Sequence, residues 1–99
     1  MLFLAQMEVV IPHDIDETRL AELKAAEFQR AQEIQRSGRW PHLWRVAGRY
    51  ANVSVFEVDS VDELHDLLSS LPMFAFMDIT VTPLATHPSS IPTNEMELS

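Results

Sequence analysis

An acidic and a basic residue, one helical turn apart, give this sequence its clearest chemical signal. Between residues 16 and 38 apolar side chains recur at helical spacing and form one stripe, which contains Leu20, Leu23, Ala31 and Ile34. At about 100° per residue, Lys24 and Glu27 fall within the same stripe. The pattern therefore predicts that Glu27 faces the interior, where a carboxylate costs desolvation free energy unless a partner offsets it.

Two interpretations of this pair stay open from the residues alone. Glu27 and Lys24 can form an ion pair that satisfies two buried charges, or Lys24 can extend its charged end to solvent. Alternatively, burial raises the proton affinity of Glu27 and makes it a candidate general base. Lys24 would then lower the cost of ionising Glu27 or donate a hydrogen bond to a substrate oxygen.

A second group of candidate site residues surrounds the strand that we expect over residues 39–50. Arg45 is the best candidate to bind a carboxylate, because its guanidinium can donate to both oxygens, and Arg49 is the second choice. Tyr50 and Asn52, two residues apart, could direct a hydroxyl and an amide at one oxygen. Further candidates are His42 and Trp44 for ligand contacts, and Trp40 and Phe56 for pocket walls. Each has a structural alternative, which is a salt bridge for Arg45 and a core or turn position for the others.

Several chemistries are excluded by residues and motifs that are missing. The chain has no cysteine, so a disulfide framework, a thiolate metal site and a thiol nucleophile are excluded. Its four histidines lack the spacing of a metal site, and we expect His65 and His87 to be structural. Glycine-rich phosphate loops and serine nucleophile motifs are missing as well. We therefore expect no metal site, no nucleotide cofactor and no acyl-enzyme chemistry.

Length, composition and charge limit the class of protein. Ninety-nine residues suit one domain, and an apolar fraction of 46% favours a folded one. A net charge of −8 repels phosphate backbones, so we expect no binding to nucleic acid. The longest apolar segments are far shorter than the ~20 residues of a membrane span, and no secretory signal is recognisable. These features favour a small cytoplasmic protein that does not enter membranes.

The order of predicted elements indicates the fold class. Strands are expected over residues 1–11, 39–50, 53–58 and 74–81, with helices over residues 16–38 and 61–70. The order β-α-β-β-α-β is that of a ferredoxin-like α+β domain, an antiparallel four-stranded sheet with two helices on one face. We assign this domain to residues 1–83, and expect residues 84–99 to form a tail that packs on a neighbouring subunit and frays from Thr93. Large apolar residues on the other sheet face predict that a second subunit covers it.

Several runs of residues are similar to one known family. The chain resembles the muconolactone Δ-isomerases in three segments: LKAAE at 23–27, HLWRVAG at 42–48 and YANVSVF at 50–56. Shorter matches extend the likeness over nearly all of residues 1–92: MLF at 1–3, LP at 71–72, MDI at 77–79 and HPSSI at 87–91. Leu4, Ala5, Gln6 and the last several residues depart from the family pattern. A substrate contact from the first strand is therefore not carried over.

The resemblance implies an enzyme of aromatic-compound breakdown, in the catechol branch of the β-ketoadipate pathway. It implies conversion of muconolactone to 3-oxoadipate enol-lactone without cofactor or metal, in a homodecamer with active sites near subunit contacts. This reaction moves a proton from C4 to C2 of the lactone and passes through a dienolate. Glu27 would be the base, assisted by Lys24, while Arg45 would bind the carboxymethyl group and Tyr50 and Asn52 the dienolate oxygen.

Other functions are compatible with the same residues. A chloromuconolactone dehalogenase would share the scaffold and the first deprotonation, and would then lose chloride. A noncatalytic module that binds a ligand or forms oligomers would use Glu27 only as a structural group. A cofactor-free monooxygenase on a dimeric α+β barrel would take up oxygen with a phenolic substrate, which we do not expect.

Overall fold

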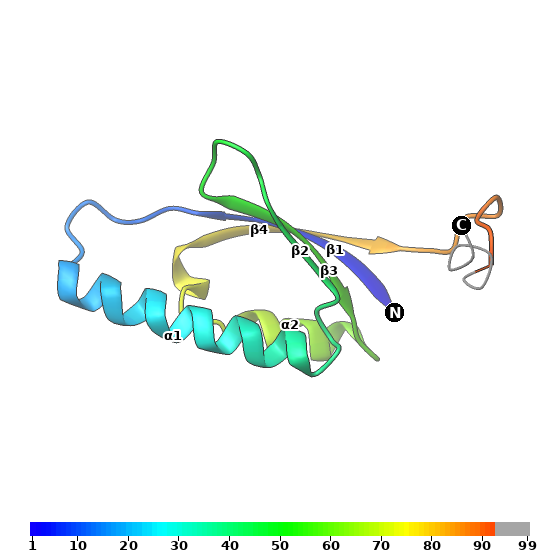
Figure 1. Cartoon of the computed structure of the whole chain (residues 1–99), viewed down its shortest axis with the longest axis horizontal. Coiled ribbons are helices and arrows are strands. Elements are labelled where there is room, and N and C mark those ends of the chain that lie inside the picture. The colour runs from blue at the N-terminus through cyan, green and yellow to red at the C-terminus, as the bar shows by residue number, and fades with distance from the viewer. Residues whose placement is uncertain (93–99) are drawn as a thin grey trace.

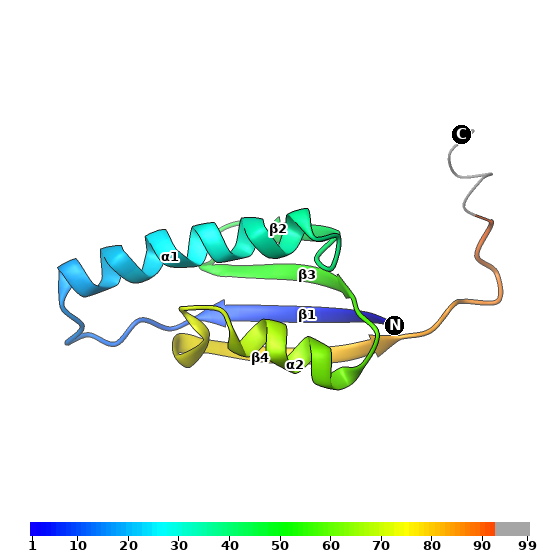
Figure 2. The same cartoon turned by 90° about the horizontal axis from the view of Figure 1, so that it is seen from below.

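The computed structural model describes residues 1–92 and has the predicted order of elements (Figure 1). Its helices and strands are β1 (Leu2–Val9), α1 (Glu17–Arg36), β2 (His42–Arg45), β3 (Ala51–Glu57), α2 (Val61–Ser69), the short 3-10 helix η1 (Phe74–Phe76) and β4 (Met77–Leu84). The strands form one antiparallel sheet in the order β2-β3-β1-β4. Both helices lie on the same face of this sheet, α1 along its β2–β3 side and α2 along its β4 side (Figures 1 and 2). This arrangement confirms the predicted ferredoxin-like α+β class.

Both helices begin at a side chain that caps their first turn. The Asp16 carboxylate accepts a hydrogen bond from the N–H three residues on at 2.9 Å, and the Ser60 hydroxyl accepts one from the Glu63 N–H at 3.0 Å. The Glu63 side chain does not complete a capping box with Ser60, because its carboxylate pairs with Arg39 at 3.0 Å. α1 ends two residues before Gly38, whose φ of 83° favours glycine. Neither of these two helices has the length and apolar character needed to cross a membrane.

The hydrophobic core lies between the sheet and the two helices. It takes alternate residues of the central strands together with the apolar stripes of the helices, and contains Phe3, Ala5, Met7, Ile34, Trp40, Phe56, Val58, Leu64, Leu68 and Leu71. Trp40 stacks on Phe56 with ring centroids 4.8 Å apart. Ser54 is fully buried beside them, and its hydroxyl donates a hydrogen bond to Asn52 Oδ1 at 2.7 Å. The core therefore fixes which side chains of each strand point toward the helices.

Two predicted strands contain turns. The second strand is regular only in β2, because the chain then turns, with the Val46 N–H bonded to the Ala51 carbonyl at 2.9 Å. Residues 74–76, expected to begin the fourth strand, instead form η1, where the Phe76 N–H bonds to the Met73 carbonyl at 2.9 Å. Both turns lie at the same end of the sheet (Figure 1).

The C-terminal segment leaves the sheet after β4. Leu84 still pairs with Leu2, one residue beyond the predicted domain end at residue 83. Residues 85–92 then run away from the sheet and the helices (Figures 1 and 2). The fraying predicted from Thr93 lies outside the described residues.

Candidate active site

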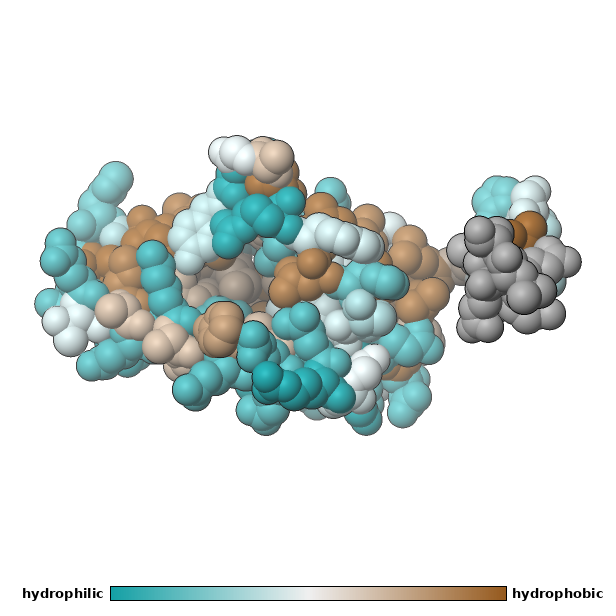
Figure 3. Space-filling view, viewed as in Figure 1, coloured by the Kyte–Doolittle hydropathy of each residue, from teal (hydrophilic) through white to brown (hydrophobic). Residues whose placement is uncertain are grey.

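A pocket of about 680 Å³ opens between α1 and the sheet, at the end where the β2–β3 turn and η1 lie. This volume suits a small organic ligand. Its walls consist of Val9, Lys24, Glu27, Phe28, Ala31, Trp40, Leu43, Arg45, Tyr50, Ala51, Asn52, Met73 and Met77. Figure 3 shows a hollow between α1 and the β2–β3 turn, with apolar residues inside it. Six predicted site residues thus come together: Lys24, Glu27, Trp40, Arg45, Tyr50 and Asn52.

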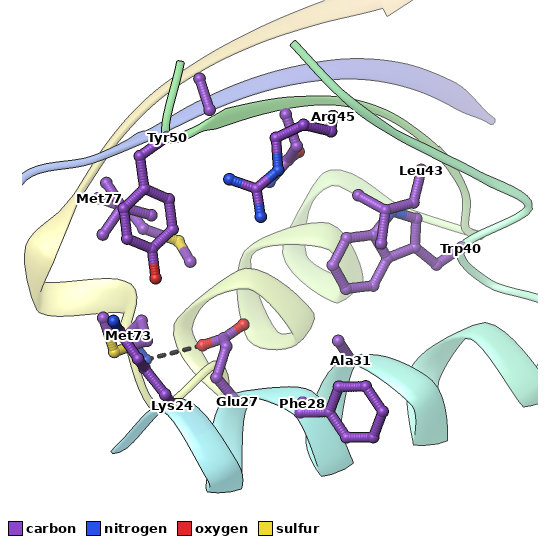
Figure 4. Close-up of a pocket in the computed structure, with 13 residues that line it drawn as sticks. Lys24, Glu27, Phe28, Ala31, Trp40, Leu43, Arg45, Tyr50, Met73 and Met77 are labelled. Atoms are coloured by element: carbon purple, nitrogen blue, oxygen red, sulfur yellow. Dashed lines mark hydrogen bonds between the residues drawn. The ribbon is translucent and has the colours of Figure 1, made fainter. Parts of the chain in front are cut away.

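Glu27 extends from the middle of α1 into this pocket (Figure 4). The backbone N–H of Met73 donates a hydrogen bond to Glu27 Oε1 at 2.8 Å, and the other carboxylate oxygen faces the cavity. Burial raises the pKa of Glu27 above its ordinary value, and the hydrogen bond from Met73 opposes this rise. One donor therefore holds the carboxylate in surroundings that increase its affinity for a proton.

The partly buried charge predicts a pH-dependent effect of Glu27→Gln on stability. Folding raises the pKa of Glu27, so the folded protein binds a proton at this carboxyl more tightly than the unfolded chain does. The resulting contribution to the free energy of unfolding is fully present below the ordinary pKa of 4.5 and is lost as the pH rises through the raised pKa. The glutamine oxygen can accept the Met73 N–H without carrying a charge. We therefore expect the free energy of unfolding of the variant, relative to that of the parent, to be higher at about pH 7 than at about pH 4. Urea unfolding at equal protein concentration measures this difference. The same stability difference at both pH values would contradict a buried charge on Glu27.

Lys24 does not form the ion pair that its spacing allows. Within residues 1–92 no salt bridge joins Lys24 to Glu27, and the Lys24 side chain is exposed. The Lys24 Nζ lies 5.7 Å from the centroid of the Tyr50 ring, within the range of a cation–π contact. The alternative of a buried ion pair is therefore wrong, and Lys24 is a cation at the edge of the pocket.

Arg45 projects from β2 into the pocket, on the side opposite Glu27 (Figure 4). In the described part of the chain it forms no salt bridge, and its Cζ lies 5.3 Å from the centroid of the Tyr50 ring. Arg49, the second candidate, is engaged elsewhere, since its Nη2 lies 2.6 Å from Glu8 Oε1. The guanidinium of Arg45 is therefore available to an anionic group of a ligand.

Tyr50 and Asn52 border the pocket on the sheet side. The Tyr50 ring extends from the β2–β3 turn with its hydroxyl directed toward α1 (Figure 4). Asn52 Oδ1 accepts the hydrogen bond from the Ser54 hydroxyl, which leaves the amide nitrogen of Asn52 to act as a donor. Both residues can therefore donate to an oxygen of a ligand in this pocket.

The structure does not bring His42 and Trp44 into this pocket. Successive residues of β2 point to opposite sides of the sheet, so Leu43 and Arg45 face the helices while His42 and Trp44 face away. On the outer side their rings stack with centroids 5.1 Å apart, and Trp44 is 55% exposed. Contrary to the prediction, neither side chain lines the pocket that contains Glu27.

The pocket also contains residues that we did not predict. Leu43 lies on the same side of β2 as Arg45, and Phe28, which is 64% exposed, lies next to Glu27 on α1. Trp40, a predicted wall residue, is buried there, and its indole N–H has no hydrogen-bond partner among the described residues. The alternation along β2 could have identified Leu43 from the sequence. Residues 1–92 hold no group of three His, Asp or Glu side chains placed to bind a metal.

Comparisons with known proteins identify the family of this chain. The family model of muconolactone Δ-isomerase matches residues 1–90. The muconolactone Δ-isomerase of Cupriavidus pinatubonensis is 54% identical over 91 residues, which are 92% of this chain and 99% of that protein. The muconolactone Δ-isomerase of Pseudomonas aeruginosa is 52% identical over 91 residues, which are 92% of this chain and 95% of that protein. A crystal structure of muconolactone isomerase matches with a TM-score of 0.88 and 54% identity, over 94% of this chain and 97% of that chain. The chain therefore belongs to the muconolactone Δ-isomerase family.

Proposed function

We propose that the protein is a muconolactone Δ-isomerase, which moves a proton from C4 to C2 of the lactone and gives 3-oxoadipate enol-lactone. The observation that carries this proposal is the Glu27 carboxylate, which has one oxygen free in the pocket and the Arg45 guanidinium opposite it. A base and an anion-binding group on opposite sides of a small pocket suit a proton shift in a lactone that carries a carboxylate. Membership of the family over residues 1–90 supports the same activity.

The proton shift takes place in two steps at one carboxylate. Glu27 takes the C4 proton, and the electron pair of the C4–H bond passes through the double bond to the lactone carbonyl, giving a dienolate. Protonated Glu27 then returns the proton to C2, which leaves the double bond in its new position and restores the carboxylate. The raised pKa of Glu27 suits both steps, because the group must accept a proton from carbon and give it back. Atoms and electrons balance without a co-reactant.

The other pocket residues supply binding and charge stabilisation. Arg45 would hold the carboxymethyl group of the substrate through two parallel hydrogen bonds. Tyr50 and Asn52 would donate to the oxygen on which negative charge develops. Lys24, whose Nζ lies near the Tyr50 ring, would add a positive charge at the same side of the pocket.

We also propose that the protein acts as a homo-oligomer in the cytoplasm, within the catechol branch of the β-ketoadipate pathway. Leu2, Trp44 and Leu84, on the outer sheet face or its edge, are 43%, 55% and 42% exposed. Such apolar area favours burial against another copy of the chain, and the family resemblance implies ten copies. Residues 85–92 are the segment that we expect to pack on a neighbouring subunit. Sedimentation velocity at several protein concentrations tests the assembly, and a monomer at all concentrations would contradict it.

Turnover of muconolactone by the purified protein is the direct test of the activity. We expect the ultraviolet spectrum to change with formation of the enol-lactone, without added metal or cofactor. The same assay with the 5-chloro analogue, combined with measurement of released chloride, separates an isomerase from a dehalogenase. A folded protein that turns over neither lactone would contradict the proposed function and favour a noncatalytic binding module.

A further inference from the structure

The hydrogen bond from Met73 to Glu27 joins two residues that are 46 positions apart in the chain. We propose that the backbone N–H of Met73 is a positioning group for the base. It holds Oε1 of Glu27 and leaves Oε2 as the oxygen that exchanges protons with the substrate. This proposal rests on the proposed function, because it assigns a role to a group that contacts the proposed base.

The surrounding structure fixes this donor in place. Leu71 and Met73, on either side of Pro72, are 2% and 1% exposed, so both side chains anchor the segment in the interior. The proline ring limits backbone rotation between them. The Phe74 N–H bonds to the Leu71 carbonyl at 2.9 Å and closes the turn. The Met73 N–H is therefore directed at the Glu27 carboxylate before a ligand enters, as preorganised groups of active sites are.

Lys24 is a competing partner for the same carboxylate. It lies three residues before Glu27 on α1, a spacing at which opposite charges commonly pair on a helix. In the described structure no salt bridge forms between them, and the carboxylate turns toward Met73 (Figure 4). The hydrogen bond thus holds the Glu27 carboxylate on Met73 in place of an ion pair with Lys24.

The same hydrogen bond affects the ionisation of the base. Burial raises the pKa of Glu27, whereas the Met73 N–H lowers it by stabilising the charged form. Without this donor the pKa of Glu27 would rise further, and a smaller fraction of the protein would hold the ionised base at neutral pH. Loss of the donor should therefore change both the orientation and the titration of Glu27.

An amide-to-ester substitution at Met73 tests this role, because it replaces the N–H with an oxygen and keeps the side chain. The matched control is the same substitution at Ser90, whose N–H bonds to the His87 carbonyl at 3.0 Å in a turn that does not line the pocket. We expect the Met73 ester to lower kcat for muconolactone by about tenfold to a hundredfold and to move the acid limb of the pH profile to higher pH. The Ser90 ester should leave that limb in place. An unchanged acid limb in the Met73 ester would overturn the proposal.

A second measurement uses the chain without an ester and does not depend on folding of the modified protein. In nitrogen–proton correlation spectra, the Met73 amide signal should shift with pH in step with the side-chain carboxyl carbon of Glu27. This shift should disappear in Glu27→Gln, while the Phe74 amide serves as the internal control. A Met73 amide shift that does not change as Glu27 titrates would also overturn the proposal.

Failure of the positioning role and failure of the proposed function give different results. A parent protein that turns over neither lactone would overturn the proposed function, whereas parental turnover by Glu27→Gln would remove Glu27 as the base and the role of Met73 with it. An inactive Glu27→Gln together with a Met73 ester that keeps the parental pH profile would overturn the positioning role alone.

Discussion

Glu27→Gln is expected to lower kcat for muconolactone by about 10³-fold, within the range that general bases contribute. The glutamine amide can still accept the Met73 N–H, which is 2.8 Å from Oε1 in the parent, but it cannot take a proton from carbon. KM should change little, because the substitution keeps the size of the side chain and does not touch the proposed carboxylate contact. Steady-state kinetics at neutral pH measures both constants.

Glu22→Gln is the matched control for this variant. Glu22 lies on the same helix, is exposed, and does not line the pocket, so the same loss of charge should leave turnover near the parental value. Circular dichroism and sedimentation must show that both variants fold and assemble like the parent. Near-parental kcat in folded Glu27→Gln would remove Glu27 from the mechanism and require another group as the base.

The orientation of Glu27 could be predicted because the helix period is a local property of the sequence. The apolar stripe of α1 places Leu23 and Ile34 in the interior, and Glu27 lies between them on the same side. The helix period could not determine whether the Lys24 side chain is buried or exposed. It is exposed, although Lys24 falls at the edge of this stripe. A long side chain at such a position can extend to solvent, and only the packing of neighbouring elements decides the outcome.

Alternation along β2 predicts the side chains that share a side of the strand, but not the side that faces the helices. Alternation along a strand separates Leu43 and Arg45 from His42 and Trp44. Assigning both Arg45 and Trp44 to one pocket conflicts with that alternation, and the structure places only Arg45 there. Alternation alone does not tell which side faces the helices, because that depends on how the whole sheet pairs and packs.

Contacts between backbone groups and side chains distant in the chain could not be predicted from the sequence. The Met73 N–H reaches Glu27 because η1 replaces the first residues of the predicted fourth strand and places this turn beside α1. No side-chain pattern marks a backbone donor of this kind. The family resemblance, in contrast, supplied the reaction, which a proton acceptor in a pocket does not specify by itself.

Arg45→Ala is expected to raise KM for muconolactone by about 10-fold to 100-fold, with a smaller change in kcat. Hydrogen bonds to a charged group contribute about 1.5–3 kcal/mol, which corresponds to this range of affinity. The carboxymethyl group does not take part in the proton shift, so its contact should stabilise the bound substrate and the transition state alike. Arg45→Lys should give an intermediate KM, because an ammonium group keeps the charge and loses the second parallel hydrogen bond.

Arg49→Ala separates a contact in the pocket from general attraction between the protein and an anionic substrate. Arg49 lies four residues from Arg45, but its Nη2 binds Glu8 Oε1 at 2.6 Å, outside the pocket that contains Glu27. Both variants remove one positive charge, so long-range attraction should weaken similarly in each, and a higher KM in Arg45→Ala alone isolates the direct contact. Equal KM values would exclude Arg45 as the carboxylate-binding group. The substrate carboxylate would then have to bind Lys24, the other cation among the residues that line this pocket.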